Sequence, residues 1–319
     1  MAPPDLSRPV GAVSSAALAL GAACALASPL AFGQATGVVG GDLQKRASGV
    51  LAMMGYMLTP DVTTGSLAIS NGTTGNPDFG MTTLGGGFTA SGRYPLYLEL
   101  TLGYGRYDPT FTSSGPAEGS VAAKWEAYSA TGGIGWSFPL ARELVFRPIF
   151  NFSYGRVDSN VTADRAGSGD EVDFLHNGQL NAYGVGGSLM LDYERYRPGN
   201  EIDLELRYTN IHLQSFGGSS TAVQGNADAQ SLSLWSRWRA PIGATLLERP
   251  LRYVLEFAHT TFLGDLDGVL GFNHLSSFGA GLELDSSARD IPVTRTRLMA
   301  RYRIGEDVTG WSIGLAVSF

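Results

Sequence analysis

Two side chains in the stretch "NHLSSFG" could carry out nucleophilic chemistry. His274 and Ser276 stand two residues apart, and this spacing puts them on one face of a strand. A serine hydroxyl becomes a nucleophile when an imidazole accepts its proton, and a third group must orient that imidazole. The parity of Phe278, Leu282 and Leu284 assigns the pair to the apolar face. Catalysis there would require a third polar group on the same face.

The flanking segments offer no carboxylate on that face. The polar residues of the same parity on the flanking segments are Thr294, Thr296, His259 and Thr261. The nearby acids, Glu256 and Glu283, have the opposite parity. The sequence therefore favours a non-catalytic polar pair, and a hydrolase that uses His274 and Ser276 is the alternative.

A second set of reactive groups consists of charges at alternate positions, carboxylates on some segments and arginines on others. If adjacent segments pair, acid–base ladders form between them and keep a charged interior ordered. A pathway for an ion or charged substrate is the alternative. The set comprises Glu99, Asp192, Glu201, Asp203, Glu205, Glu283 and Asp285, with Arg237, Arg239, Arg295, Arg297, Arg301 and Arg303.

Other chemistry is not indicated by the sequence. It has no zinc-ligand spacing, phosphate loop or dinucleotide motif, so we expect no metal and no cofactor. The formal net charge is −7, which gives no reason to expect nucleic acid as a partner, since nucleic-acid binding calls for clustered Lys and Arg.

The elements that position these residues are strands with strict period-two alternation, which fill the chain from residue 61 onward. Most are longer than the five or six residues usual for globular strands, roughly 10–15 residues each. A tilted strand that crosses a membrane needs about 9–11. The twelve expected strands are 62–70, 79–90, 95–108, 124–138, 143–157, 179–193, 201–213, 228–240, 250–262, 269–285, 293–304 and 310–319.

The connections and faces of these strands predict an all-β, transmembrane antiparallel barrel of about twelve strands. The longest connections, at 109–123, 158–178 and 214–227, all fall at one end, as in outer-membrane barrels. A closed barrel puts the apolar faces against lipid, the charged faces around a wet lumen, and leaves no open edge. Aromatic girdles are expected from Tyr94, Phe138, Tyr196 and Phe319 at one end and from Tyr104, Tyr107, Phe111, Trp125 and Tyr154 at the other.

The segments before residue 61 divide in two. Arg8 and the weakly apolar run 10–27 predict a signal peptide over 1–35. Residues 36–60 predict a short helix, because Leu43, Ala47, Leu51 and Leu58 recur at helical spacing. This helix is expected either in the lumen or in the periplasm, and the barrel is expected to occupy 61–319.

The stretch "GWSIGLAVSF" resembles the assembly signature of bacterial outer-membrane barrels. Its apolar residues alternate up to a terminal aromatic: Trp311, Ile313, Leu315, Val317 and Phe319. Twelve strands after a short helix look like the translocator barrel of autotransporters. Only residues 36–60 separate the signal from the first strand, so the likeness is to solitary barrels without a passenger.

The resemblance implies a place and partners. It implies a Gram-negative outer membrane, both termini periplasmic, outer-membrane lipids around the barrel, periplasmic chaperones, and a barrel-assembly machinery that recognises the last strand. The expected function is a narrow pore or translocator-like barrel that is not an enzyme. The alternatives are an outer-membrane lipid hydrolase using His274 and Ser276, and a surface-recognition barrel that acts through its long loops.

Overall fold

The computed structural model describes residues 37–38, 51, 54–58, 65–70, 79–90, 94–107, 110–113, 119–161, 178–219, 224–269, 272–286, 293–306 and 309–318. Residues 51 and 54–58 are helical, and almost all the others belong to strands. Within these ranges, no helix is long and apolar enough to span a membrane. The predicted signal peptide and Phe319 lie outside the described residues.

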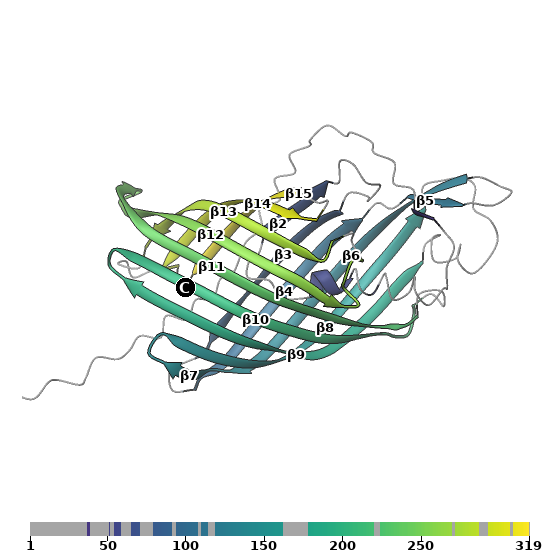
Figure 1. Ribbon diagram of the computed structural model, residues 1–319, viewed down its shortest axis with the longest axis horizontal. Helices are drawn as coiled ribbons and strands as arrows, with labels where there is room; N and C mark the ends of the chain where they lie inside the picture. Colours follow the sequence, from purple (N-terminus) through teal and green to yellow (C-terminus); the bar gives the residue numbers. More distant parts are fainter. Residues whose placement is uncertain are drawn as a thin grey trace, which may run out of the picture.

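Twelve antiparallel strands form a closed ring, which confirms the predicted barrel (Figure 1). Each strand pairs with the next in the ring, including β6 with β8, and the pairing of the last strand, β15, with the first, β2, completes the circuit. The ring strands are β2 (Gly65–Ser70), β3 (Phe79–Thr89), β4 (Leu96–Tyr107), β6 (Gly119–Trp136), β8 (Leu144–Val161), β9 (Gln179–Arg197), β10 (Asn200–Ser215), β11 (Asn226–Leu246), β12 (Arg249–Gly264), β13 (His274–Asp285), β14 (Arg295–Gly305) and β15 (Thr309–Ser318).

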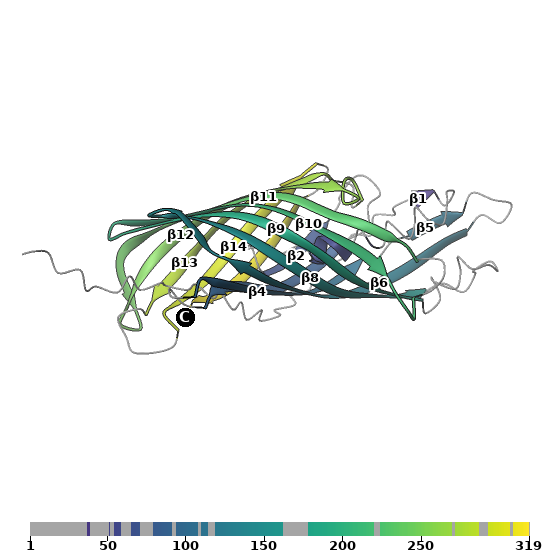
Figure 2. The same ribbon diagram turned by 90° about the horizontal axis from the view of Figure 1, so that it is seen from below.

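Three short strands extend the ring at its ends. β7 (Phe138–Ala141) continues β6 and pairs with β8. β5 (Thr110–Ser113) pairs with β6 beyond the opposite end of the barrel, and β1 (Gly37–Val38) pairs with β5 in parallel. Figure 1 shows β5 at that far end, opposite β7, and Figure 2 shows β1 beside β5.

The two ends of the barrel differ in their connections. At one end, here the short-turn end, two-residue turns join strands at 142–143, 198–199 and 247–248. Leu247 and Glu248 both have positive φ, 53° and 61°, which is the backbone of the primed turn that matches the twist of a hairpin. The other end, here the long-loop end, carries the connections between β4 and β6, β8 and β9, and β10 and β11.

Alternation along each strand separates an inward from an outward face. On β4, Glu99 is 9 % exposed whereas its neighbour Leu100 is 53 % exposed. The same contrast separates Asp203 from Leu204 on β10 and Arg297 from Leu298 on β14. The charged face therefore points into the barrel and the apolar face points out, as the alternation predicts.

The prediction that Tyr196 and Trp125 belong to the outward aromatic girdles is wrong. Tyr196 points inward, where Arg239 and Arg295 lie over its ring. Trp125 also points inward and packs against the buried apolar cluster. Both have the parity of the inner face, which outweighs their position near a strand end. The outward aromatics at these ends include Phe138 at the short-turn end and Tyr104 and Tyr154 at the long-loop end.

Candidate functional site: the barrel interior

The half of the lumen nearer the long-loop end is lined by apolar side chains and holds the helix. Leu51, Met54, Tyr56, Met57 and Leu58 are each at most 7 % exposed. They pack in one cluster with inward residues of the surrounding strands and of the segment after β12. These residues are Ala127, Val157, Leu180, Ala182, Ile211, Leu213, Ala227, Ala229, Phe262, Leu266, Phe272 and Leu275. The helix therefore meets an apolar lining rather than the charged one.

Glycines in the barrel wall make room for the helix. A Cβ at Gly155 of β8 would lie 2.0 Å from Met54 Sδ, and one at Gly105 of β4 would lie 2.6 Å from Met57 Sδ. A side chain at either position would require the neighbouring methionine to move. The wall and the helix therefore fit each other at these two methionines.

Hydrogen bonds fix both the side and the end of the helix. Tyr56 Oη donates to the Leu266 carbonyl at 2.7 Å. At the end of the helix, Thr131 Oγ1 donates to the Leu58 carbonyl at 2.6 Å and Ser129 Oγ to the Met57 carbonyl at 3.3 Å. Carbonyls at a helix C-terminus have no partner within the helix, and here β6 supplies partners from its inner face.

Below the helix, one ion pair crosses the middle of the lumen. Arg207 of β10 donates to both carboxylate oxygens of Glu99 of β4, at 2.9 and 2.6 Å. Asn151 donates to Glu99 at 2.7 Å, and Arg207 also donates to Ser188 at 3.0 Å. Bidentate pairs of this kind are the strong form of the interaction.

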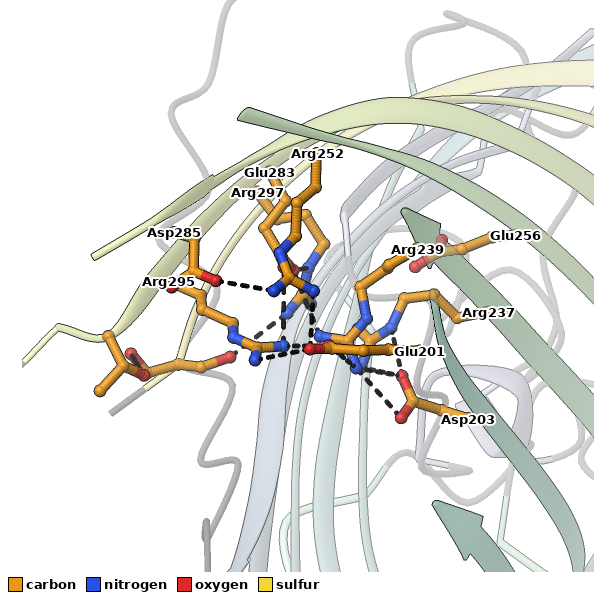
Figure 3. Close-up of polar contacts among 12 residues, drawn as sticks. Glu201, Asp203, Arg237, Arg239, Arg252, Glu256, Glu283, Asp285, Arg295 and Arg297 are labelled. Carbon is orange, nitrogen blue, oxygen red and sulfur yellow. Dashed lines mark hydrogen bonds and ion pairs between the residues drawn. The ribbon is translucent and has the colours of Figure 1, made fainter. Parts of the chain in front are cut away.

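The short-turn half of the lumen holds a larger network (Figure 3). Figure 3 shows Glu201 at its centre. Glu201 contacts Arg252 at 2.6 Å, Arg295 at 2.5 Å and Arg239 at 3.2 Å. The residues labelled in Figure 3 are Glu201, Asp203, Arg237, Arg239, Arg252, Glu256, Glu283, Asp285, Arg295 and Arg297. Several arginines thus share one carboxylate, and this ties several strands to one point.

The remaining contacts of this network link further strands. Arg237 and Arg239 meet Asp203 at 2.7 and 2.9 Å. Glu283, which is fully buried, accepts from Arg297 at 2.6 Å and lies 3.4 Å from Arg239. Asp285 lies 3.1 Å from Arg252. Figure 3 shows Glu256 beside this network, and Arg301 contacts it at 2.7 Å.

The structure brings most of the sequence-derived charge set together, but not as ladders between adjacent strands alone. Asp203 with Arg237 and Glu283 with Arg297 are pairs of neighbouring strands. Glu201 of β10 and Arg295 of β14 are separated by three strands along the ring, so their contact spans the lumen. The side chains of this network are also closely packed, since Glu201, Asp203 and Arg239 are at most 4 % exposed.

Some participants lie outside the predicted set. They are Arg147, which pairs with Asp192, and Arg207, Arg252 and Glu256. Each of these residues has the parity of the inward face, and this parity could have identified it from the sequence. Of the predicted residues, Glu205 and Arg303 are also buried on the inner face.

The predicted His274 and Ser276 lie together on the outward face of β13, but their partners differ from the expected ones. Ser276 Oγ lies 2.9 Å from Nδ1 of His259, on β12, and not beside an acid. His274 Nδ1 lies 3.6 Å from Oε1 of Glu306, just after β14. Strand parity could not identify Glu306, because this residue lies beyond the end of β14.

The last strand presents its larger side chains outward. Trp311 and Ile313 are 68 % and 60 % exposed, whereas Ser312 and Ser318 are buried. Leu315 and Val317 share the outward parity and are partly exposed. β15 pairs with β14 along Thr309–Ser318 and with β2 along residues 309–313.

Comparisons with known proteins give likeness of fold. Three solved autotransporter barrels are similar: the translocator domain of NalP from Neisseria meningitidis, the β domain of Bordetella BrkA and the transport unit of AIDA-I from Escherichia coli. Their TM-scores are 0.45, 0.48 and 0.48, with 13 %, 12 % and 9 % sequence identity. The matches cover 87 %, 80 % and 88 % of this chain and 98 %, 96 % and 99 % of those chains.

No protein-family model matches this chain, and no curated protein sequence matches it either.

Proposed function

We propose that this chain is an outer-membrane barrel of the translocator type whose lumen is closed by its own N-terminal helix. The long-loop end faces the outside of the cell and the short-turn end faces the periplasm, as is usual for such barrels. In this resting form the barrel performs no reaction in its lumen and passes no solute. Movement of the helix is needed before anything passes.

The outward surface supports a membrane location. Large apolar side chains are exposed around the barrel, among them Leu100, Phe150, Leu206, Leu282 and Leu298. Exposed apolar surface on this scale is unfavourable in water and favourable in lipid. The buried charges of the lumen lie on the opposite face of the same strands, which is the pattern of a transmembrane barrel.

The positions of β1 and of the helical residues are the observation that supports a barrel of the translocator type. β1 pairs with β5 beyond the long-loop end, while helical residues 51 and 54–58 lie inside the lumen and are followed by β2 of the ring. Residues 37–38 therefore lie beyond the long-loop end, and residues 51 and 54–58 lie inside the barrel. A solute pore has no need to hold its own chain in this way, whereas a barrel that has passed a polypeptide retains one.

Surface labelling tests this orientation. In a background with Cys24→Ser, Val38→Cys is expected to react with a membrane-impermeant maleimide on intact cells, because β1 lies at the end assigned to the outside. The control is Gly199→Cys, in the turn between β9 and β10, where an added Cβ meets nothing within 4 Å. That position is expected to react only after the outer membrane is permeabilised. Labelling of Gly199→Cys but not Val38→Cys on intact cells would reverse the orientation.

We also propose that β15 carries the signal that the barrel-assembly machinery recognises, after periplasmic chaperones have kept the chain soluble. Trp311 and Ile313 present an apolar outward row, and Phe319 continues its parity in the sequence.

Deletion of Phe319 is expected to lower the amount of folded barrel in the outer membrane several-fold, as measured by heat-modifiable migration on a denaturing gel. Ser318→Ala is the matched control and is expected to assemble normally, since it changes only a side chain on the inward face. Equal assembly of both variants would remove Phe319 from the signal.

A further inference from the structure

A cluster of polar side chains stands on the outward surface at the long-loop end, outside the lumen. Directly below it, Phe257, Phe278, Tyr302 and Trp311 lie side by side on β12 to β15. The next outward position toward the long-loop end holds His259 and Ser276 as cross-strand partners. The cluster thus begins where the aromatic row ends.

The geometry of the cluster places a serine beside an imidazole. Ser276 Oγ lies 2.9 Å from His259 Nδ1. The other ring nitrogen, Nε2, lies 3.4 Å from Thr261 Oγ1. If Nε2–H donates a hydrogen bond to Thr261 Oγ1, then Nδ1 carries the lone pair and accepts a hydrogen bond from the Ser276 hydroxyl. This is the tautomer that a general base requires.

A second imidazole borders the pair. The ring of His274 lies 5.7 Å from that of His259, centroid to centroid. Its Nδ1 lies 3.6 Å from the Glu306 carboxylate. Ser276, His259 and His274 are all partly exposed, so a substrate in the surrounding lipid can reach them.

We propose that Ser276 and His259 form the nucleophile and base of an esterase on the lipid-facing wall of the barrel. The substrate class is a long-chain carboxylic ester of a membrane lipid. This inference rests on the membrane location proposed above, and it does not depend on whether the lumen translocates a polypeptide. His274 and Glu306 act as positioning residues that hold the His259 ring.

The height of the pair on the barrel favours a lipid ester as substrate. Aromatic rows mark the boundary between the acyl chains and the headgroups, and the ester bonds of membrane lipids lie at that boundary. Ser276 stands one outward position beyond this row. A carboxylic ester of a lipid that packs against Phe278 and Trp311 would therefore lie level with the hydroxyl.

The reaction is a two-step hydrolysis that balances without a cofactor. Ser276 Oγ attacks the ester carbonyl as His259 accepts the hydroxyl proton. The carbon–oxygen bond to the alcohol breaks, the alcohol leaves with the proton from His259, and an acyl-serine remains. Water then attacks the acyl-serine while His259 takes its proton, and the proton returns to Ser276 as the fatty acid leaves.

The test uses the purified full-length protein in mixed micelles, in two arms. One arm supplies a diacyl glycerophospholipid and the other supplies lipopolysaccharide, and released fatty acid is measured by mass spectrometry. We expect release in one arm, at least a hundredfold loss with Ser276→Ala or His259→Phe, and a smaller loss with His274→Gln. The matched control is His212→Phe, which changes an outward histidine that pairs instead with Asp228 at 2.7 Å.

A covalent probe gives a second readout that a purely structural role would not produce. A fluorophosphonate is expected to modify Ser276, as read by peptide mass, and the modification is expected to disappear in His259→Phe. Heat-modifiable migration verifies that each variant is folded. The proposal is overturned if neither lipid is hydrolysed and Ser276 is not modified, or if hydrolysis persists in folded Ser276→Ala.

Discussion

Replacing Glu99 with leucine is expected to destabilise the barrel by about 3–5 kcal/mol, because the change leaves a buried guanidinium without its carboxylate. Glu99 and Arg207 are 9 % and 4 % exposed. Among the described residues, the hydrogen bonds that Arg207 would keep after the change go to the hydroxyl groups of Ser188 and Thr209. Unfolding in urea, followed by tryptophan fluorescence in detergent micelles, measures the difference.

The double variant separates the penalty of an unpaired charge from the loss of the contact itself. Glu99→Leu with Arg207→Met removes both charges and is expected to recover most of the stability that either single change loses. The control is Glu143→Ala, which removes a partly exposed carboxylate paired with the half-exposed Arg197 at 3.2 Å. It is expected to cost less than about 1 kcal/mol. Additive losses in the double variant would show that the two side chains do not act as a pair.

Replacing Gly155 with phenylalanine is expected to displace the helix from the lumen and open the barrel to ions. The added ring would occupy the space of Met54, whose Sδ lies 2.0 Å from the position of a new Cβ. The backbone of β8 cannot yield, because it is paired with β6 and β9 on both sides. The helix is held by side chains and a few hydrogen bonds, so it is the part that moves.

Planar bilayer recordings measure this effect. The unchanged protein is expected to be silent, and Gly155→Phe is expected to conduct at a level approaching that of a variant lacking residues 36–60. The control is Gly80→Phe, at an outward position of β3 where a Cβ meets nothing within 4 Å, and it is expected to stay silent. If neither the Gly155 variant nor the deletion variant conducts ions, the ion pairs of the lumen and not the helix block the barrel.

The strands and their faces can be predicted because they depend on a local signal. A period of two in β4 or β10 reports the side of the sheet for every residue, and twelve such segments suffice for the ring. The strand ends are less well predicted. β11 continues to Leu246, beyond the expected end at 240. The two strands of a hairpin stay paired beyond the membrane-facing residues, until they reach the residues that form the turn.

The partners within the lumen could not be predicted, because they depend on the tilt and stagger of the whole barrel. Glu99 and Arg207 are 108 residues apart in sequence and meet only when the ring has its final cross-section. The position of the helix poses the same problem. Its apolar stripe is visible in the sequence, but the space left by Gly105 and Gly155 is a property of the assembled wall.

The outward cluster illustrates a smaller error of the same kind. The spacing of His274 and Ser276 suggests that they are partners, since they share a face two residues apart. Register decides otherwise, because Ser276 lies directly opposite His259 on the neighbouring strand. Cross-strand neighbours are closer than residues two apart along a strand, so the histidine of β12 makes the contact.

The closure of the ring between β2 and β15 sets the order in which the protein can mature. β2 is the first strand of the ring and β15 the last, so the circuit stays open until the whole chain has been delivered. Until then, the arginines and carboxylates of β4, β10 and β14 lack their partners across the lumen and must remain hydrated. The final pairing therefore completes the burial of these charges late, and such dependence on distant contacts is typical of slow folding. A chain stalled before β15 would present its charges, its apolar wall and two open strand edges together, which makes it a substrate for proteases rather than a partly working barrel.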